Sequence, residues 1–173
     1  NAVIKKKKKI IAIIPARIGS KGVKSKNIRK VKNLTLIHRT INQLKKLKLI
    51  NTIAISTDSK IIQKIAIKNG VWCKNLRPKS ISGDKSYTFE AIDHVLKQIE
   101  VKYDYICEVQ PTYVFRKSST ILDCLQKIKQ KNYDSLISVS RVNDTYHPNF
   151  VIKKKNNKYK FKKSTTLYSR HKL

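Results

Sequence analysis

Short apolar runs alternate along the chain with segments of helical periodicity. Residues 10–14, Ile-Ile-Ala-Ile-Ile, form a continuous apolar run, which is typical of a strand buried on both faces. Other runs rich in β-branched residues share this short length and are read in the same way. The predicted strands cover residues 10–14, 52–56, 71–73, 103–109 and 136–142, with two weaker ones at 150–152 and 159–161.

Between these strands, apolar residues recur every three or four positions, which predicts amphipathic helices with one buried face. The inward-facing sets are Ile37, Ile41, Leu44 and Leu47; Ile61, Ile62, Ile65 and Ala66; Phe89, Ile92, Leu96 and Ile99; and Ile121, Leu122, Leu125 and Ile128. The expected N-caps are Thr35, then Thr57 or Asp58, then Ser118 or Ser119, and the second helix should end near Asn69-Gly70.

Alternation of strands and helices predicts an α/β fold, with a mainly parallel sheet and helices on both of its faces. We expect a basic N-terminal extension at residues 1–9 and a single domain at residues 10–173. Ligands of such sheets bind outside the carboxyl ends of the strands. The loops to examine are therefore residues 15–34, 56–58, 76–88 and 110–118.

Composition excludes several classes of protein. No apolar run approaches the 18 residues of a membrane-spanning helix, and the basic start leads into too short an apolar stretch for a secretory signal. The 3 Cys form no Cys-x-x-Cys pair, so we expect neither a disulfide scaffold nor a zinc ribbon, and we predict a reducing cytoplasm as the location.

The chain is strongly basic, with 40 Lys and Arg against 10 Asp and Glu, and a formal charge of +30. One interpretation is a nucleic-acid-binding surface, because cations neutralise phosphates. The other is compositional drift, because Lys, Ile and Asn, which share A/T-rich codons, are abundant here. Few of the basic residues are Arg, the side chain suited to bidentate recognition, so drift is favoured over a dedicated surface.

The loop after the first strand carries the clearest candidate chemistry. It reads Pro-Ala-Arg-Ile-Gly-Ser-Lys-Gly-Val-Lys-Ser-Lys-Asn over residues 15–27. Arg17, Lys21 and Lys26 place cations on a loop that two glycines keep open, which suits a triphosphate. The string is neither a Walker A motif nor G-x-G-x-x-G. By charge alone, an ordinary solvated basic loop remains the alternative.

Residue order makes this loop more specific, because P-A-R-x-G-S-K-G-x-x-x-K-N-I resembles the opening loop of the acylneuraminate cytidylyltransferases, the CMP-sialic acid synthetase family. Later segments agree in the same order over residues 10–173. They are Ser56-Thr57-Asp58, Leu76-Arg77-Pro78, Asp84 within an S-D-T-like segment, Gln110-Pro111-Thr112 with Arg116, Ile137-Ser138-Val139-Ser140, and Arg170-His171-Lys172-Leu173.

The resemblance implies a Rossmann-like nucleotide-diphospho-sugar transferase fold and a Mg²⁺-assisted transfer of CMP from CTP to the anomeric hydroxyl of a nine-carbon 2-keto sugar acid. It implies a cytoplasmic enzyme, a homodimer at full length, in lipopolysaccharide or capsule biosynthesis. Implied catalytic residues are Arg17 and Lys21. The implied nucleotide contacts are Ala16, Arg17, Ser20, Lys21, Lys26, Asn27, Arg77, Ser86 and Thr88, and the implied acceptor contacts are Gln110, Arg116 and Arg170.

This sequence departs from the family pattern in places. Lys85 follows Asp84 where the family has Thr, and residues 113–115, Tyr-Val-Phe, replace Ser-Pro-Leu. The family continues beyond the end of this chain with an N-G-x-I-Y strand and a D-x-D pair that ligates Mg²⁺. The metal ligands are therefore unknown here, and the chain is expected to be a fragment or a degraded copy.

Two other function classes stay open: an inactive relic of this family that only associates with partners, and a basic nucleic-acid-binding α/β protein. Stacking surfaces for bases need aromatic residues among the cations, and the basic runs at Lys5–Lys9 and Lys153–Lys155 lack them. The cytidylyltransferase reading predicts that Lys21→Ala weakens CTP binding far more than Lys8→Ala, and that CTP is preferred over ATP. The sugar could be sialic, legionaminic or pseudaminic acid.

Overall fold

The computed structural model describes residues 8–19, 22–131, 133–139, 152–155 and 158–161. The chain divides into two compact units, Asn1–Leu136 and Ile137–Leu173, which we describe separately. In the second unit, β6 (Ile152–Lys155) pairs antiparallel with β7 (Lys158–Phe161). These strands overlap the two weak strands expected from the sequence near residues 150–152 and 159–161.

The first unit is built on a parallel sheet of β4 (Thr52–Ser56), β1 (Ile10–Pro15) and β5 (Tyr105–Glu108), in that spatial order. β1 is central, with Ile11 opposite Thr52 on one side and Ile106 on the other. Its side chains from Ile10 to Ile14 are fully buried, because helices cover both faces of the sheet. The expected α/β fold with a parallel sheet is confirmed.

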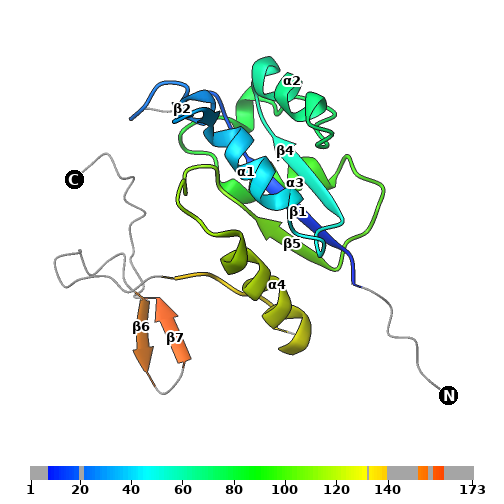
Figure 1. Ribbon diagram of the computed structural model, residues 1–173, viewed down its shortest axis with the longest axis vertical. Coiled ribbons are helices and arrows are strands. Elements are labelled where there is room, and N and C mark those ends of the chain that lie inside the picture. The colour runs from blue at the N-terminus through cyan, green and yellow to red at the C-terminus, as the bar shows by residue number, and fades with distance from the viewer. Residues whose placement is uncertain (1–7, 20–21, 132, 140–151, 156–157, 162–173) are drawn as a thin grey trace. The chain divides into compact units, whose positions relative to one another are not determined.

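One face of the sheet packs against α1 (Leu36–Lys45), α2 (Lys60–Lys68) and α4 (Ser118–Lys131), and Figure 1 shows α1 crossing in front of β1. The other face packs against α3 (Thr88–Leu96). The remaining elements of this unit are the hairpin of β2 (Lys30–Val31) and β3 (Leu34–Thr35), and the single 3₁₀ turns η1 (Lys26–Ile28) and η2 (Lys79–Ile81).

Helix boundaries follow local chemistry, with one correction. The Thr35 side chain accepts the His38 N–H at 3.3 Å and caps α1, as expected. The cap of α2 is Ser59, which accepts the Ile62 N–H at 3.4 Å, so the expectation of Thr57 or Asp58 was wrong. Position 70, where α2 ends, has a φ of 63°, a conformation that favours Gly.

Two apolar residues expected to face the core are exposed. Ile61 is 57% exposed, because α2 meets the sheet only along the stripe that contains Ile62 and Ala66. Phe89 is 65% exposed; it lies in the first turn of α3 and stacks on the Tyr87 ring, with centroids 5.7 Å apart. Helix α3 ends at Leu96, before Ile99, which still packs against the core.

Two expected strands need correction. Residues 71–73 form a single bridge, Trp72 with Ala54, rather than a strand. Of the strand expected at 136–142, residues 136–139 are not extended in a sheet, and 140–142 lie outside the described residues. No helix in the described parts of the chain is long and apolar enough to cross a membrane.

Within the expected basic extension, the two residues that the structure describes are tied to the start of β5. The Lys9 N–H donates to Asp104 Oδ2 at 2.6 Å, and Lys8 Nζ donates to the Tyr105 hydroxyl at 2.6 Å. Residues 1–7 lie outside the described residues. The division into an extension at 1–9 and one domain at 10–173 stays a prediction.

Candidate functional site

A hollow of about 250 Å³ lies at the carboxyl ends of β1 and β5. The chain runs from β1 to β4 on one side and then crosses to β5 on the other, so these two ends form the topological switch point, where α/β sheets bind ligands. The lining residues are Pro15, Arg17, Gly19, Lys26, Asn27, Arg77, Ile81, Gly83, Ser86, Tyr87, Thr88, Gln110, Pro111 and Thr112.

Arg17 enters the hollow directly after β1. Its Nη2 donates to Asp84 Oδ1 at 2.7 Å, and its Nη1 reaches the Ser82 carbonyl at 3.4 Å. The side chains of Arg17 and Asp84 are 33% and 40% exposed, so solvent screens this ion pair. The Arg17 guanidinium is therefore anchored at the rim but accessible to an anion.

The peptide unit that follows the Arg17 Cα is bound on both of its polar groups. Its carbonyl accepts from Asn27 Nδ2 at 2.9 Å, and its N–H, that of Ile18, donates to Asp58 Oδ1 at 2.7 Å. Because Asn27 must turn its amide nitrogen to that carbonyl, its Oδ1 is left buried without a hydrogen-bond partner. Asn27 is 7% exposed and lines the hollow.

Arg77 is a buried cation beside the same hollow. Arg77 is 7% exposed, and its backbone N–H donates to the Thr57 carbonyl at 2.7 Å. The Nε of its side chain has no hydrogen-bond partner. Burial lowers the pKa of the Arg77 guanidinium, Arg17 lowers it further, and Asp58 opposes both. A buried, incompletely paired guanidinium that lines a cavity is suited to an anionic or hydrogen-bond-accepting ligand.

Gln110 and Arg116 follow β5 on the far side of the hollow. Gln110 Nε2 donates to Glu108 Oε1 at 3.0 Å, and the Arg116 guanidinium donates to the Gln110 carbonyl and lies 5.5 Å from the Tyr113 ring. Burial lowers the pKa of Arg116 as well. Glu108, a carboxylate within an otherwise apolar strand, thus orients a residue of the hollow.

The structure gathers most of the candidate residues around one hollow, although they come from distant parts of the sequence. Ala16 is fully buried beside the lining, and its N–H continues the sheet to the Ser56 carbonyl at 2.9 Å. Arg116 reaches the lining through Gln110. The candidates Ser20, Lys21 and Arg170 lie outside the described residues.

Sequence reasoning missed the contact that Asp58 makes, because it named Asp58 as a possible helix cap and as part of the Ser56-Thr57-Asp58 motif without a partner. It placed Asp84 in the S-D-T-like segment without a partner; Asp84 lies in a turn and binds Arg17. Either carboxylate could have been noted, because acidic residues are rare in this chain and both lie in loops predicted to face the ligand. Tyr87 could have been found from its place between Ser86 and Thr88.

A metal ion finds no ready set of ligands in the described part of the chain. That part contains no group of three His, Cys, Asp or Glu side chains able to hold one. Near the hollow, Asp58 binds a backbone N–H and Asp84 binds Arg17. The described residues therefore do not fit a metal held mainly by protein carboxylates.

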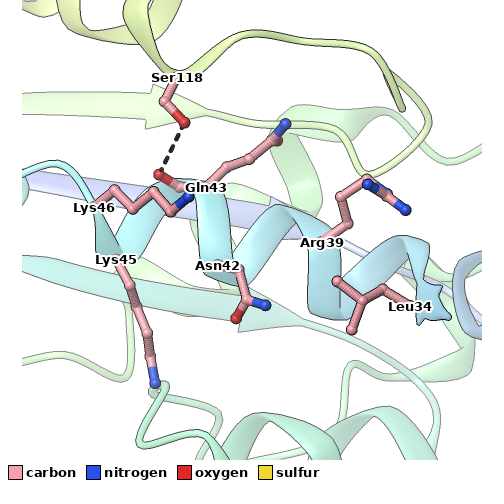
Figure 2. Close-up of a pocket in the computed structure, with 7 residues that line it drawn as sticks. All are labelled: Leu34, Arg39, Asn42, Gln43, Lys45, Lys46 and Ser118. Atoms are coloured by element: carbon pink, nitrogen blue, oxygen red, sulfur yellow. Dashed lines mark hydrogen bonds between the residues drawn. The ribbon is translucent and has the colours of Figure 1, made fainter.

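A larger hollow of about 530 Å³, which shares no lining residue with the first, lies along an outer face of α1 (Figure 2). Ser118, at the start of α4, closes one side, and its Oγ donates to the Gln43 carbonyl at 3.5 Å. Lining residues are Leu34, Arg39, Asn42, Gln43, Lys45, Lys46 and Ser118. None of the motif residues contributes, so the smaller hollow is the better candidate site.

Comparisons with known proteins show the family of this chain. The model of a family described as cytidylyltransferase matches residues 11–173. The chain is 35% identical over 136 residues to an N-acylneuraminate cytidylyltransferase of Escherichia coli, which covers 78% of this chain and 32% of the relative. It is 34% identical over 137 residues to a CMP-N,N'-diacetyllegionaminic acid synthase of Legionella pneumophila. That alignment covers 78% of this chain and 59% of the relative.

A third relative, a post-translational flagellin modification protein B of Campylobacter coli, is 35% identical over 133 residues, covering 75% of this chain and 57% of the relative. This chain thus spans less than two thirds of the length of these relatives.

Solved structures support the fold. A CMP:2-keto-3-deoxy-manno-octonic acid synthetase complexed with CTP has a TM-score of 0.61 at 15% identity, over 72% of this chain and 48% of that one. A cytidylyltransferase from Leptospira borgpetersenii has a TM-score of 0.55 at 20% identity, over 73% of this chain and 51% of that one. At these identities the likeness establishes the arrangement of the elements.

Proposed function

Since this chain belongs to the cytidylyltransferase family, we propose that it binds CTP and transfers CMP to the anomeric hydroxyl of a nine-carbon 2-keto sugar acid. The hydroxyl oxygen bonds to the α-phosphorus of CTP and releases its proton to water, and the bond from that phosphorus to the bridging oxygen breaks, so that pyrophosphate leaves. One observation carries the proposal: Arg17, Lys26 and Arg77 meet at one hollow at the switch point of the sheet. Relatives named for N-acylneuraminate and for diacetyllegionaminic acid support the acceptor class.

In this proposal, Arg17, Lys21 and Lys26 neutralise the triphosphate, with Ser20 beside them. Transfer of a phosphoryl-type group depends mainly on positioning and on stabilising charge. Arg17 and Lys21 then stabilise the charge that develops on pyrophosphate as it leaves. The exposed, solvent-screened ion pair of Arg17 with Asp84 supports this role, because a triphosphate can replace that carboxylate.

The nucleoside is proposed to lie over Asn27, Arg77, Ser86 and Thr88, with the Ala16 backbone beneath it. The unpartnered Asn27 Oδ1 and Arg77 Nε offer one acceptor and one donor to a polar ligand. A hollow of about 250 Å³ is small for a ligand pocket. We therefore expect it to favour a pyrimidine over a purine.

The acceptor is proposed to approach from the side of Gln110 and Arg116, with Arg170 binding its carboxylate. Arg116 is already oriented by the Gln110 carbonyl and the Tyr113 ring. Tyr113 and Phe115, which are 64% and 93% exposed, stand where the family has Ser and Leu. Their size should change which acceptor sugars fit.

We propose Mg²⁺ as the cofactor, as the family resemblance implies; bound with CTP, it would supply positive charge to the phosphates. The described residues offer no set of carboxylates for it, so its ligands are not assigned. We also propose a cytoplasmic location, which the three free cysteines, Cys73, Cys107 and Cys124, support. By resemblance, the full-length protein is proposed to form a homodimer and to act in lipopolysaccharide or capsule biosynthesis.

Calorimetric titration with CTP, and with ATP as competitor, tests the proposal. Lys26→Ala should weaken CTP binding by about tenfold, since one charge-assisted phosphate contact is lost. Lys24→Ala is the matched control, because Lys24 is an exposed cation on the same loop that does not line the hollow. Lys8→Ala is less suitable, because Lys8 binds the Tyr105 hydroxyl.

Equal losses for Lys26→Ala and Lys24→Ala would contradict the site, and no preference for CTP over ATP would contradict the base assignment. Tight, sequence-selective DNA binding that survives physiological salt would favour the nucleic-acid-binding alternative. Formation of a CMP-sugar from CTP, Mg²⁺ and a nine-carbon keto acid separates an active enzyme from a relic.

A further inference from the structure

We infer that Asp58 is a positioning residue for CTP binding, because its carboxylate fixes the peptide unit between Arg17 and Ile18 and so directs the Arg17 side chain into the hollow. The inference rests on the proposed function for its ligand. It concerns a residue that neither touches the hollow nor carries the charge that CTP requires.

The contact geometry supports this role. Asp58 Oδ1 accepts the Ile18 N–H at 2.7 Å, and Asn27 Nδ2 donates to the Arg17 carbonyl at 2.9 Å on the opposite edge of the same peptide plane. A peptide plane held at both its N–H and its C=O cannot rotate without breaking one bond. This restrains the ψ angle of Arg17 and hence the direction of its Cα–Cβ bond, from which the side chain extends to the hollow.

The position of Asp58 in the fold explains how one carboxylate serves this purpose. Residues 57–59 form the turn between β4 and α2, with Ser59 as the helix cap. The Thr57 carbonyl accepts the Arg77 N–H at 2.7 Å, and the next residue, Asp58, binds Ile18. One turn therefore ties down both loops that bring arginines to the hollow. Because Thr57 is fully buried, this turn is a rigid support.

Charge alone gives the opposite expectation for Asp58. A carboxylate near a triphosphate site repels the ligand, so its removal by itself should tighten CTP binding. A positioning role predicts weaker binding when the carboxylate is removed, despite the loss of this repulsion. The sign of the change therefore separates the two explanations.

The test compares Asp58→Ala with Asp58→Asn by calorimetric titration with CTP and Mg²⁺ at fixed salt. Asn retains a side-chain oxygen that can accept the Ile18 N–H, and it removes the charge. We expect the Kd for CTP to rise by about tenfold in Asp58→Ala and to stay equal to or below that of the unaltered chain in Asp58→Asn.

Asp104→Ala is the matched control. Asp104 also accepts a backbone N–H, that of Lys9 at 2.6 Å, but at the amino end of the sheet, away from the hollow. Its Kd for CTP should match that of the unaltered chain. If Asp58→Ala does not fold, Asp58→Glu replaces it: the charge remains, the oxygen is displaced by one methylene, and binding should be weaker than in the unaltered chain, which carries the same charge.

Hydrogen exchange at the Ile18 amide gives a readout that does not need CTP. Exchange should accelerate in Asp58→Ala and stay slow in Asp58→Asn. If the unaltered chain does not bind CTP, the proposed function fails, and the exchange result still decides whether the peptide is fixed. Unchanged or tighter CTP binding in Asp58→Ala, or equal weakening in Asp104→Ala, would overturn the inference.

Discussion

Arg17 and Asp84 form an ion pair at the rim of the hollow, with Arg17 Nη2 and Asp84 Oδ1 2.7 Å apart. The two residues lie on different loops, 67 positions apart in the sequence. A triphosphate that binds Arg17 must compete with this carboxylate. The pair therefore anchors the guanidinium in the ligand-free chain and opposes CTP.

Asp84→Asn should lower the Kd for CTP by up to about fivefold, since an ion pair this exposed contributes about 0–1 kcal/mol. Asp93→Asn is the control, because Asp93 forms a comparable 2.7 Å ion pair with Lys97 on the surface of α3. Isothermal titration with CTP measures both variants. Weaker CTP binding in Asp84→Asn would instead mean that Asp84 aligns Arg17 for the phosphates.

Arg77→Met should separate binding from stability. The substitution removes a buried guanidinium whose Nε has no partner, and it keeps the backbone bond to Thr57. We expect the free energy of unfolding to stay within about 1 kcal/mol or to increase, while CTP affinity falls by at least about tenfold. Urea unfolding and CTP titration measure the two effects, and a large loss of stability would contradict this account.

His94 should make stability depend on pH. Burial is the main reason why the pKa of His94 lies below its ordinary value of 6.5; Arg77 lowers it further, and Asp93 and the Leu76 backbone oppose both. The unfolded chain therefore takes up a proton near pH 6.5, before the folded chain does. The stabilising contribution of neutral His94 is fully present above about pH 6.5, and it is lost as the pH falls through the pKa of His94 in the folded chain.

Urea midpoints at pH 7.5 and pH 5.5 check this expectation, and His94→Gln should reduce the difference between them. If the urea midpoints at the two pH values differ as much in His94→Gln as in the unaltered chain, the pH dependence belongs to other groups.

Gly70→Ala should destabilise the chain by about 1–2 kcal/mol, because the φ of 63° at this position disfavours a side chain. At Gly19 an added Cβ meets no atom within 4 Å, and no left-handed φ applies. Gly19→Ala should therefore change the free energy of unfolding by less than about 0.5 kcal/mol. Urea unfolding of the two variants decides, and equal effects would contradict the conformational explanation.

The periodicity of the sequence determined the elements. The apolar run at 10–14 could only be a strand covered on both faces, and the predicted parallel sheet is confirmed. Where one local signal competed with another, the prediction failed. Ile61 fits the helical period, but α2 touches the sheet along a narrower stripe than that period allows. Residues 71–73 have strand composition, yet only Trp72 pairs with the sheet.

The order of residues also identified the loops of the site, because motifs at strand ends are local in sequence. The two hydrogen bonds that hold the Arg17–Ile18 peptide depend on tertiary structure alone. Asp58 and Asn27 reach this peptide from 40 and 10 residues away; Asp58 follows β4, and Asn27 lies within η1. Only the parallel pairing of β4 with β1 brings the Asp58 carboxylate within hydrogen-bond distance of the Ile18 N–H. The sequence thus supplied the charges, and the packing of the sheet set which of them face the hollow and which hold the backbone in place.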